Sequence, residues 1–168
     1  MSYTSHQQSG QALTARCAIL TLSDTRTDAT DTSGQMIRNL LLPLGHSVVY
    51  HQIVPDEPAV FEQILLQYLN DNSIDCILTN GGTGISQRDQ TIDVISRLLD
   101  YPLPGFGELF RMLSYAQIKS GAMLSRAVGG IAQGKLLFAM PGSTKAVELA
   151  MTQLILPEIG HLLSELRK

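Results

Sequence analysis

The sequence predicts an α/β fold, a three-layer αβα sandwich built around a mainly parallel sheet. Apolar segments with strand character alternate along the chain with amphipathic segments of about 10 to 14 residues, a usual helix length. The strand segments are apolar throughout instead of alternating with polar residues, as expected where helices cover both faces of a sheet. The connections between such parallel strands are expected to be right-handed.

Length and composition indicate one ordinary globular domain. The 168 residues are 44% hydrophobic and 16% charged, which suits a single domain with its own core. We place a flexible tail at residues 1–14 and the domain at residues 15–168. No apolar run approaches the ~18 residues of a membrane span, and the tail lacks the hydrophobic block of a signal peptide. The chain is therefore expected to be cytoplasmic.

The net charge and the aromatic content argue against two classes of partner. The formal net charge is −3, whereas general binders of nucleic acids or membrane surfaces usually carry a basic excess. Aromatic residues make up 5% of the chain and Trp is absent, so platforms for stacking single-stranded bases are not expected. We expect neither a nucleic-acid partner nor a membrane partner.

The first half of the chain predicts three strands and two helices. Apolar runs predict strands at Cys17–Leu22, Ser47–Val54 and Asp75–Thr79. The helical spacing of apolar residues predicts a helix over residues 36–44, capped by the glycine that follows. A second helix is predicted over residues 58–69, where a proline suits the first turn and apolar residues recur on one face.

The second half predicts one further strand and four helices. The helices are predicted at residues 92–99, at residues 109–116, from Ser143 or Thr144 to about Leu156, and beyond Pro157, which opens or kinks the last one. The strand is predicted at Lys135–Met140. Prolines and glycines in Tyr101–Gly107 predict a rigid turn. Leu124–Ala132 is ambiguous, and its glycines fit a short helix followed by a turn.

Polar or glycine-rich residues follow every predicted strand. They are Ser23 and Asp24, Asp56 and Glu57, Gly81, Gly82, Thr83 and Gly84 with Arg88 and Asp89 close behind, and Pro141, Gly142, Ser143, Thr144 and Lys145. In folds of this class, ligands bind outside the carboxyl ends of the strands. We therefore expect these residues to form one connected rim that holds a ligand.

The segment from Gly81 to Gly84 has the composition of a ligand-binding loop. Without Cβ atoms the backbone approaches a ligand closely and turns its N–H groups onto an anion. The spacing matches neither a P-loop nor a dinucleotide-binding fingerprint. The alternative is an ordinary tight turn, but three glycines among four residues at the end of a strand favour ligand binding.

Two carboxylates on this rim are candidates for a magnesium–phosphate site. Mg²⁺ in proteins takes one or two carboxylates together with substrate phosphates, and Asp56 and Asp89 would supply them, with Asp24 as a third candidate. The alternative role for Asp56 and Asp89 is capping of the helices that follow them. Sequence alone leaves both roles open.

The segment from Pro141 to Lys145 places hydroxyls and a cation where a helix begins. Helix N-termini bind anions through their free N–H groups and the helix dipole. The alternative is a capped turn with a solvated Lys145. No nucleophile with a matching base is evident, so covalent catalysis is not expected. Cys17 and Cys76 lie inside apolar runs and are expected to be buried free thiols.

Several of these motifs together resemble the molybdopterin-binding (MoaB/Mog) family. The matching segments are Leu20–Asp24, Val54–Glu57, Thr79–Gly84 with Arg88 and Asp89, Pro104–Glu108 and Met140–Ser143. Two further segments, Phe110–Ser114 and Leu124–Val128, are similar to the B-type (MoaB) branch. The resemblance runs from about Cys17 to the end of the chain, and it implies the αβα molybdopterin-binding fold.

The resemblance also implies an activity and an assembly. Relatives in the family adenylylate molybdopterin: its terminal phosphate attacks the α-phosphate of Mg·ATP and pyrophosphate leaves. By this similarity, Asp56 and Asp89 would hold Mg²⁺, with ATP as co-substrate. The two glycine loops, with Ser143 and Lys145, would bind the pterin and phosphates, and Arg88 would offset phosphate charge. The family forms homotrimers, sometimes doubled to hexamers (a dimer of trimers).

Two other functions remain open from the sequence. The first is a molybdopterin carrier or assembly scaffold that uses the same glycine loop without turning over nucleotide. The second is a general nucleotide-binding protein, for which ATP binding would not depend on a pterin. The function expected from the resemblance is molybdopterin binding and adenylylation of molybdopterin with Mg·ATP.

Overall fold

The computed structural model describes residues 13–87 and 89–168, and it confirms the three-layer α/β fold. Six strands form one sheet in the order β2-β1-β3-β6-β5-β4. The strands are β1 (Arg16–Leu22), β2 (Ser47–Val54), β3 (Cys76–Asn80), β4 (Tyr101–Pro102), β5 (Val128–Ala132) and β6 (Lys135–Met140). β2, β1, β3 and β6 are parallel, whereas β5 is antiparallel to β6 and to β4. The sheet is therefore mainly parallel, as predicted.

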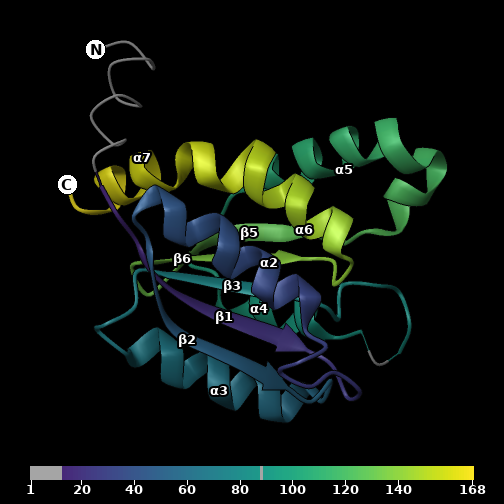
Figure 1. The fold of residues 1–168 in the computed structure, drawn as a ribbon, viewed down its shortest axis with the longest axis horizontal. Helices are drawn as coiled ribbons and strands as arrows, with labels where there is room; N and C mark the ends of the chain where they lie inside the picture. Colours follow the sequence, from purple (N-terminus) through teal and green to yellow (C-terminus); the bar gives the residue numbers. More distant parts are fainter. Residues whose placement is uncertain (1–12, 88) are drawn as a thin grey trace.

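Helices cover both faces of the sheet (Figure 1). One face carries α2 (Thr32–Leu41), α5 (Pro104–Ile118), α6 (Thr144–Ala150) and α7 (Leu156–Leu166), and the other carries α3 (Pro58–Asn70) and α4 (Thr91–Leu98). Three short helical segments complete the chain: η1 (Leu42–Leu44), η2 (Lys119–Leu124) and η3 (Met151–Ile155). None of the helices in residues 13–87 and 89–168 is long and apolar enough to cross a membrane.

Strand β1 shows why the predicted strands read as continuous apolar runs. Cys17 and Ile19 pack into the cluster under α2, α6 and α7, while Ala18 and Leu20 pack into the cluster over α3 and α4. Successive side chains of a strand point to opposite faces, so both sets must be apolar. Full burial of such a leucine or isoleucine contributes about 1.5–3 kcal/mol.

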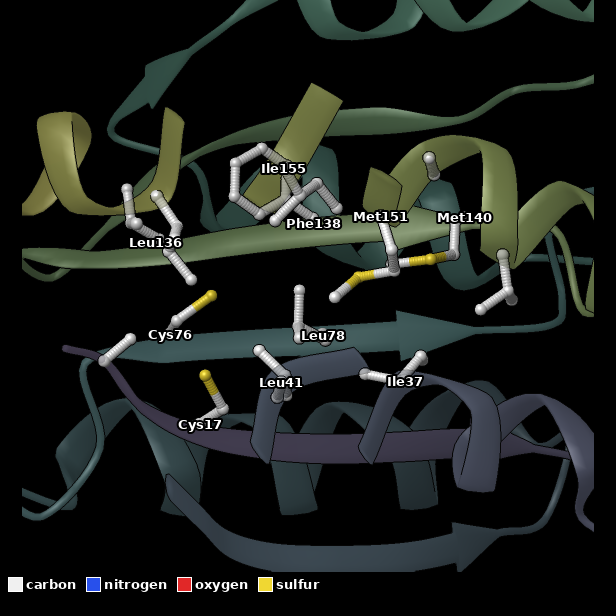
Figure 2. Close-up of a cluster of buried hydrophobic side chains, with 14 of the residues drawn as sticks. Cys17, Ile37, Leu41, Cys76, Leu78, Leu136, Phe138, Met140, Met151 and Ile155 are labelled. Carbon is white, nitrogen blue, oxygen red and sulfur yellow. The ribbon is translucent and has the colours of Figure 1, made fainter. Parts of the chain in front are cut away.

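The two cysteines are buried free thiols, as predicted. Cys17 and Cys76 are register partners on the adjacent strands β1 and β3, and both lie in the cluster drawn in Figure 2. Hydrogen bonding to Cys17, together with burial, raises the pKa of the Cys76 thiol. Both side chains therefore behave as small hydrophobic residues in this core.

The strand register brings the polar strand ends together. Leu22 at the end of β1 pairs with Val54 at the end of β2, and Asn80 at the end of β3 pairs with Met140 at the end of β6. Thr21 pairs with Asn80 across the middle of the sheet. The predicted loops after these four strands thus leave the sheet along one edge.

The prediction for residues 124–132 was wrong, because Val128–Ala132 is strand β5. A Cβ atom on Gly129 would lie 2.5 Å from the Phe138 ring, and one on Gly130 would lie 2.5 Å from the Tyr101 carbonyl oxygen. The two glycines therefore allow the strand to lie close to its neighbours, and they do not mark a turn.

The prediction of a rigid turn over Tyr101–Gly107 was also wrong. Tyr101 and Pro102 form the short edge strand β4, and Pro104 begins helix α5. Proline suits a first helical turn because its missing N–H would have no partner there. The helix thus begins at Pro104, five residues before the predicted start at Leu109.

The last helices follow the prediction closely. Ser143 caps α6 by accepting a hydrogen bond from the Ala146 backbone N–H at 3.3 Å. The wider helical turn η3 then leads into α7, which has Pro157 in its first turn. Because proline lacks an N–H, a local change of helical winding accommodates it without ending the helix.

Candidate functional site

The loop after β3 requires glycine at two positions. Gly81 has a φ of +100° and Gly82 a φ of +62°, in the left-handed region that other residues rarely adopt. A Cβ on Gly81 would lie 2.5 Å from the Leu22 carbonyl oxygen, and one on Gly82 would overlap the Thr91 hydroxyl. The loop is thus held against β1 and α4 by close backbone contacts.

The two candidate carboxylates flank this same loop. Asp56 Oδ1 lies 3.3 Å from the position that a Cβ on Gly82 would take, and Asp89 Oδ2 lies 2.8 Å from the corresponding position on Gly84. Asp56 comes from the loop between β2 and α3, and Asp89 from the residues just before α4. Two loops far apart in sequence thus bring one carboxylate each to the glycines.

Neither carboxylate caps a helix. The capping residues of α3 and α4 are Glu57 and Gln90, and neither uses its side chain for a capping hydrogen bond. Asp89 Oδ2 instead accepts a hydrogen bond from Ser86 N–H at 3.0 Å, within its own loop. Asp24 Oδ1 accepts from the Asp56 N–H at 3.0 Å. Asp24 therefore supports the loop that carries Asp56.

A pocket of about 630 Å³ opens beside the glycine loop. Of the predicted site residues, Thr83, Gly84, Pro141, Ser143 and Lys145 line it, together with Thr144. The loop after β6 closes against the loop after β3, since a Cβ on Gly142 would lie 3.2 Å from Gly81 Cα.

Other predicted site residues lie outside the pocket wall. Ser23, Asp24, Asp56, Gly81, Gly82, Asp89 and Gly142 do not line it. Arg88 lies outside the described residues. The predicted rim thus divides into residues that line the pocket and residues, including both carboxylates, that do not.

Helix α5 and the turn η2 supply the opposite wall of the pocket, which the sequence did not place there. The wall includes Phe110, Ser114, Ile118, Leu124 and Ser125. In Figure 1, α5 with η2 reaches past the edge of the sheet at which β1, β2 and β3 end. The apolar periodicity of residues 109–116 indicated a helix. It did not indicate that this helix lies next to the rim, from which it is distant along the chain.

A buried carboxylate beneath the rim was also missed. Asp31 is fully buried and caps α2 through Oδ1, which accepts from Gly34 N–H at 3.0 Å. Its Oδ2 lies 2.8 Å from both Thr21 Oγ1 and His51 Nε2. Burial raises the pKa of this carboxyl, but the hydrogen bonds from Gly34, His51 and Thr21 outweigh it and the net pKa is lowered. Asp31 therefore remains charged inside the domain.

Arg26 connects this buried group to the loop after β6. Its guanidinium contacts the Asp31 carboxylate at 3.4 Å and the Ser33 hydroxyl, and its Nη2 donates to the Gly142 carbonyl oxygen at 2.8 Å. Ser33 Oγ donates to the same carbonyl at 2.9 Å. The pattern Asp31-Thr32-Ser33-Gly34, with an acidic residue three positions before a helical N–H, was the available signal.

The histidines and carboxylates of the described residues form no group of three that could hold a metal ion. His46 is buried, and its Nδ1 accepts a hydrogen bond from the Ala15 N–H at 3.0 Å. Two carboxylates beside a glycine loop suit Mg²⁺ that is otherwise bound by substrate phosphates, because such sites do not require a complete protein cage.

The fold and the rim together define an α/β protein with its candidate site at the carboxyl edge of a mainly parallel sheet. Residues 18–161 match the family model described as a probable molybdopterin binding domain. The chain belongs to this molybdopterin-binding family, and within it to the MoaB branch.

Individual relatives support this assignment over the whole chain. Molybdenum cofactor biosynthesis protein B from Bacillus cereus is 50% identical over 169 aligned residues, covering 100% of this chain and 99% of the relative. A crystal structure of a molybdenum cofactor biosynthesis protein B has a TM-score of 0.89 at 52% identity, covering 92% of this chain and 97% of that one. The tungsten cofactor synthesizing protein MoaB from Pyrococcus furiosus has a TM-score of 0.83 at 34% identity, with coverage of 92% and 98%.

Proposed function

We propose that this protein acts in molybdenum cofactor biosynthesis, binding molybdopterin and transferring AMP from Mg·ATP to its terminal phosphate. One observation carries the proposal: Asp56 and Asp89 lie against two glycines of one loop, Gly82 and Gly84, at the carboxyl edge of the sheet. The names of the relatives concern the same pathway. Negative charge that suits a metal ion next to backbone that suits phosphates supports the proposal.

The proposed reaction is a nucleotidyl transfer. An oxygen of the terminal molybdopterin phosphate forms a bond to the α-phosphorus of ATP, and the bond from that phosphorus to the β-phosphate oxygen breaks. Pyrophosphate leaves with the electron pair of the broken bond. The attacking phosphate is already ionised near neutral pH, so the protein need not supply a base, and its task is positioning and charge neutralisation.

Each part of the rim has a role in this reaction. Asp56 and Asp89 would hold Mg²⁺, which when bound neutralises charge on the triphosphate. The backbone N–H groups of residues 82–84 would face phosphate oxygens, whereas that of Gly81 donates to the Met140 carbonyl oxygen at 3.1 Å. Lys145 is exposed on the pocket wall, where its ammonium group would offset phosphate charge. Arg88, adjacent in sequence to Asp89, is proposed for the same task.

The two parts of the rim suit the two substrates. The pocket wall contributed by Phe110, Ile118, Leu124 and Leu149 is apolar, and hydroxyls of Ser114 and Ser125 stand among these residues. Flat heterocycles with polar edges bind in such mixed pockets. We therefore assign the pterin to the pocket and the nucleotide phosphates to the carboxylate side of the glycine loop.

Pyrophosphate release from molybdopterin and Mg·ATP tests the activity. Asp89→Asn and Asp56→Asn keep the side-chain shape but remove a charge from the proposed metal site, so each is expected to lower the turnover about 100-fold or more. Glu57→Gln is the matched control, because Glu57 is exposed beside Asp56 and its side chain makes no capping hydrogen bond. Equal loss in the Glu57 variant would contradict the assigned roles.

A molybdopterin carrier or scaffold without turnover is the second candidate. One observation favours this candidate: Asp56 and Asp89 do not line the pocket, so a ligand in the pocket would not need them. Tight molybdopterin binding with no pyrophosphate from the wild-type protein would establish the carrier and reject the transferase. Binding of ATP that is independent of the pterin would instead indicate a general nucleotide-binding protein.

We also propose that the protein assembles into homotrimers, alone or as a dimer of trimers. Helix α5 and η2 expose a row of large apolar side chains: Leu109, Met112, Tyr115, Ile118 and Met123. Contiguous apolar surface of this kind is typical of protein interfaces. Met112 is 62% exposed and Met123 77%, so association of copies through this helix would remove unfavourable surface from water.

A further inference from the structure

Arg126 lies on the short connection between η2 and β5, next to the glycine loop. Its backbone N–H donates to the Thr83 carbonyl oxygen at 3.2 Å. Its guanidinium Nη2 donates to the Asp89 backbone carbonyl oxygen at 2.9 Å. One residue therefore bonds both to the glycine loop and to the backbone of the carboxylate residue proposed for metal binding.

The same guanidinium is held in place by a carboxylate on α4. Arg126 Nη2 and Nη1 lie 2.7 and 3.4 Å from the two oxygens of Asp93, in the first turn of that helix. Hydrogen bonds from Arg126 hold the pKa of the Asp93 carboxyl below its usual value. A two-oxygen pairing fixes the plane of a guanidinium, which a single contact does not. Asp93 therefore orients Arg126 toward the Asp89 carbonyl.

The connection that carries Arg126 is itself anchored to α5. Arg111 Nη1 on that helix lies 3.4 Å from the Ser125 carbonyl oxygen and 3.3 Å from the Ala127 carbonyl oxygen, on either side of Arg126. Contacts thus run from α5 through residues 125–127 to Asp89 and α4. Such a chain of contacts limits the movement of the residue at its end.

One polar atom of Arg126 has no stabilising partner. Its Nε is buried, and no hydrogen-bond acceptor for it is present in the part of the chain that the structure describes. A buried donor without an acceptor is unfavourable for folding. Local costs of this kind concentrate where a side chain is held in position for function.

We propose that Arg126 is a positioning residue that holds Asp89 beside Gly84 in the geometry required for Mg²⁺ binding. The inference rests on the proposed function of the site. Arg126 bonds the backbone carbonyl of Asp89, and its charge is matched by Asp93, so the Asp89 carboxylate keeps its orientation without pairing to Arg126. Residues that orient a metal ligand in this way change metal affinity when they are altered.

Two measurements on Arg126→Ala test the inference. The first is hydrogen exchange of the Ser86 and Asp89 backbone amides without ligand, which are expected to exchange about 10-fold faster because their loop loses a bond. The second is the Mg²⁺ concentration that half-saturates ATP binding, followed by calorimetry, which is expected to rise about 10-fold. Amides of β3 are expected to keep their protection, since the core does not involve Arg126.

Three further variants separate positioning from stability. Arg97→Ala is the matched control, because Arg97 lies on α4 and, like Arg126, pairs with a carboxylate, in this case Glu62 at 3.2 Å. It is expected to change neither measurement. Asp93→Asn alters an exposed side chain and does not threaten folding, and it is expected to show a smaller change in the same direction. Arg126→Lys keeps the positive charge but loses the paired N–H donors of the guanidinium. It is therefore expected to restore the exchange rates and the Mg²⁺ dependence only in part.

The outcomes separate the inference from the proposed function. Unchanged exchange, or faster exchange with unchanged Mg²⁺ dependence, would overturn the positioning role of Arg126. A change of the same size in Arg97→Ala would also overturn it. Failure of the proposed function would appear in the wild-type protein itself, as ATP and molybdopterin binding without pyrophosphate release.

Discussion

Gly82 shows how a single residue links the fold to the site. Its positive φ and its contact with the Thr91 hydroxyl exclude any other side chain. The absence of a Cβ also leaves Asp56 Oδ1 close to the backbone of the loop. The same property therefore satisfies a steric requirement and leaves room for a carboxylate beside the loop backbone.

The buried charge of Asp31 contributes to the stability of the fold. The net pKa of its carboxyl lies below the ordinary value of 3.8. Its charged form therefore contributes stability above that pH, and the contribution is lost as the pH falls through and below it. Asp31→Asn is expected to lower the free energy of unfolding at pH 7 by about 1–3 kcal/mol.

Urea unfolding at a series of pH values measures this contribution. The difference between the wild-type protein and Asp31→Asn is expected to shrink as the pH falls from about 5 to about 2. Asp28→Asn serves as the control, since Asp28 is exposed on the same loop. A difference that stays constant over this range would show that the charge of Asp31 does not stabilise the fold.

Helix α5 shows that glycine has different roles within one element. Gly107 faces β5, and a Cβ there would lie 2.6 Å from the Ala127 carbonyl oxygen. Gly105 is the second residue of α5, and a Cβ at this position would have no atom within 4 Å. The close approach of α5 to β5 thus requires glycine at position 107 but not at position 105.

Alanine substitutions at the two glycines measure this packing. Gly107→Ala is expected to lower the free energy of unfolding by about 1–3 kcal/mol, because backbone must move to admit the methyl group. Gly105→Ala is expected to be neutral or to stabilise the helix by up to about 1 kcal/mol. Urea denaturation compares them, and equal effects of the two changes would contradict the close crossing.

The elements of the first half of the chain followed from their sequence patterns. β1, β2 and α3 were predicted because their apolar residues have the period of a buried strand or an amphipathic helix. β5 and the start of α5 were predicted wrongly. Gly129, Gly130 and Gly107 resemble turn residues in sequence, whereas contacts with distant residues explain their presence.

At the scale of the whole molecule, the exposed row on α5 and η2 predicts association. Met112→Glu places a charge at a proposed apolar interface, so the mass in solution is expected to fall from that of three chains to the 18.3 kDa of one. Light scattering across a concentration series provides the measurement. Glu108→Gln on the same exposed helix is the control. A monomeric wild-type protein would contradict the proposed trimer.

The fold class, the rim and most of the rim residues were predictable from the sequence. Strand ends in a parallel sheet share an edge, so residues that follow successive strands are brought together whatever their separation along the chain. Gly81–Gly84, Asp56 and Asp89 were therefore predictable as neighbours.

Packing between distant elements determines which part of the rim faces a pocket and which residues form the rest of that pocket. The wall from Phe110 to Ser125 and the bonds of Arg126 depend on contacts between elements that no local pattern encodes. Periodicity reports which face of a helix is apolar, and the packing of helices on the sheet decides what that face meets.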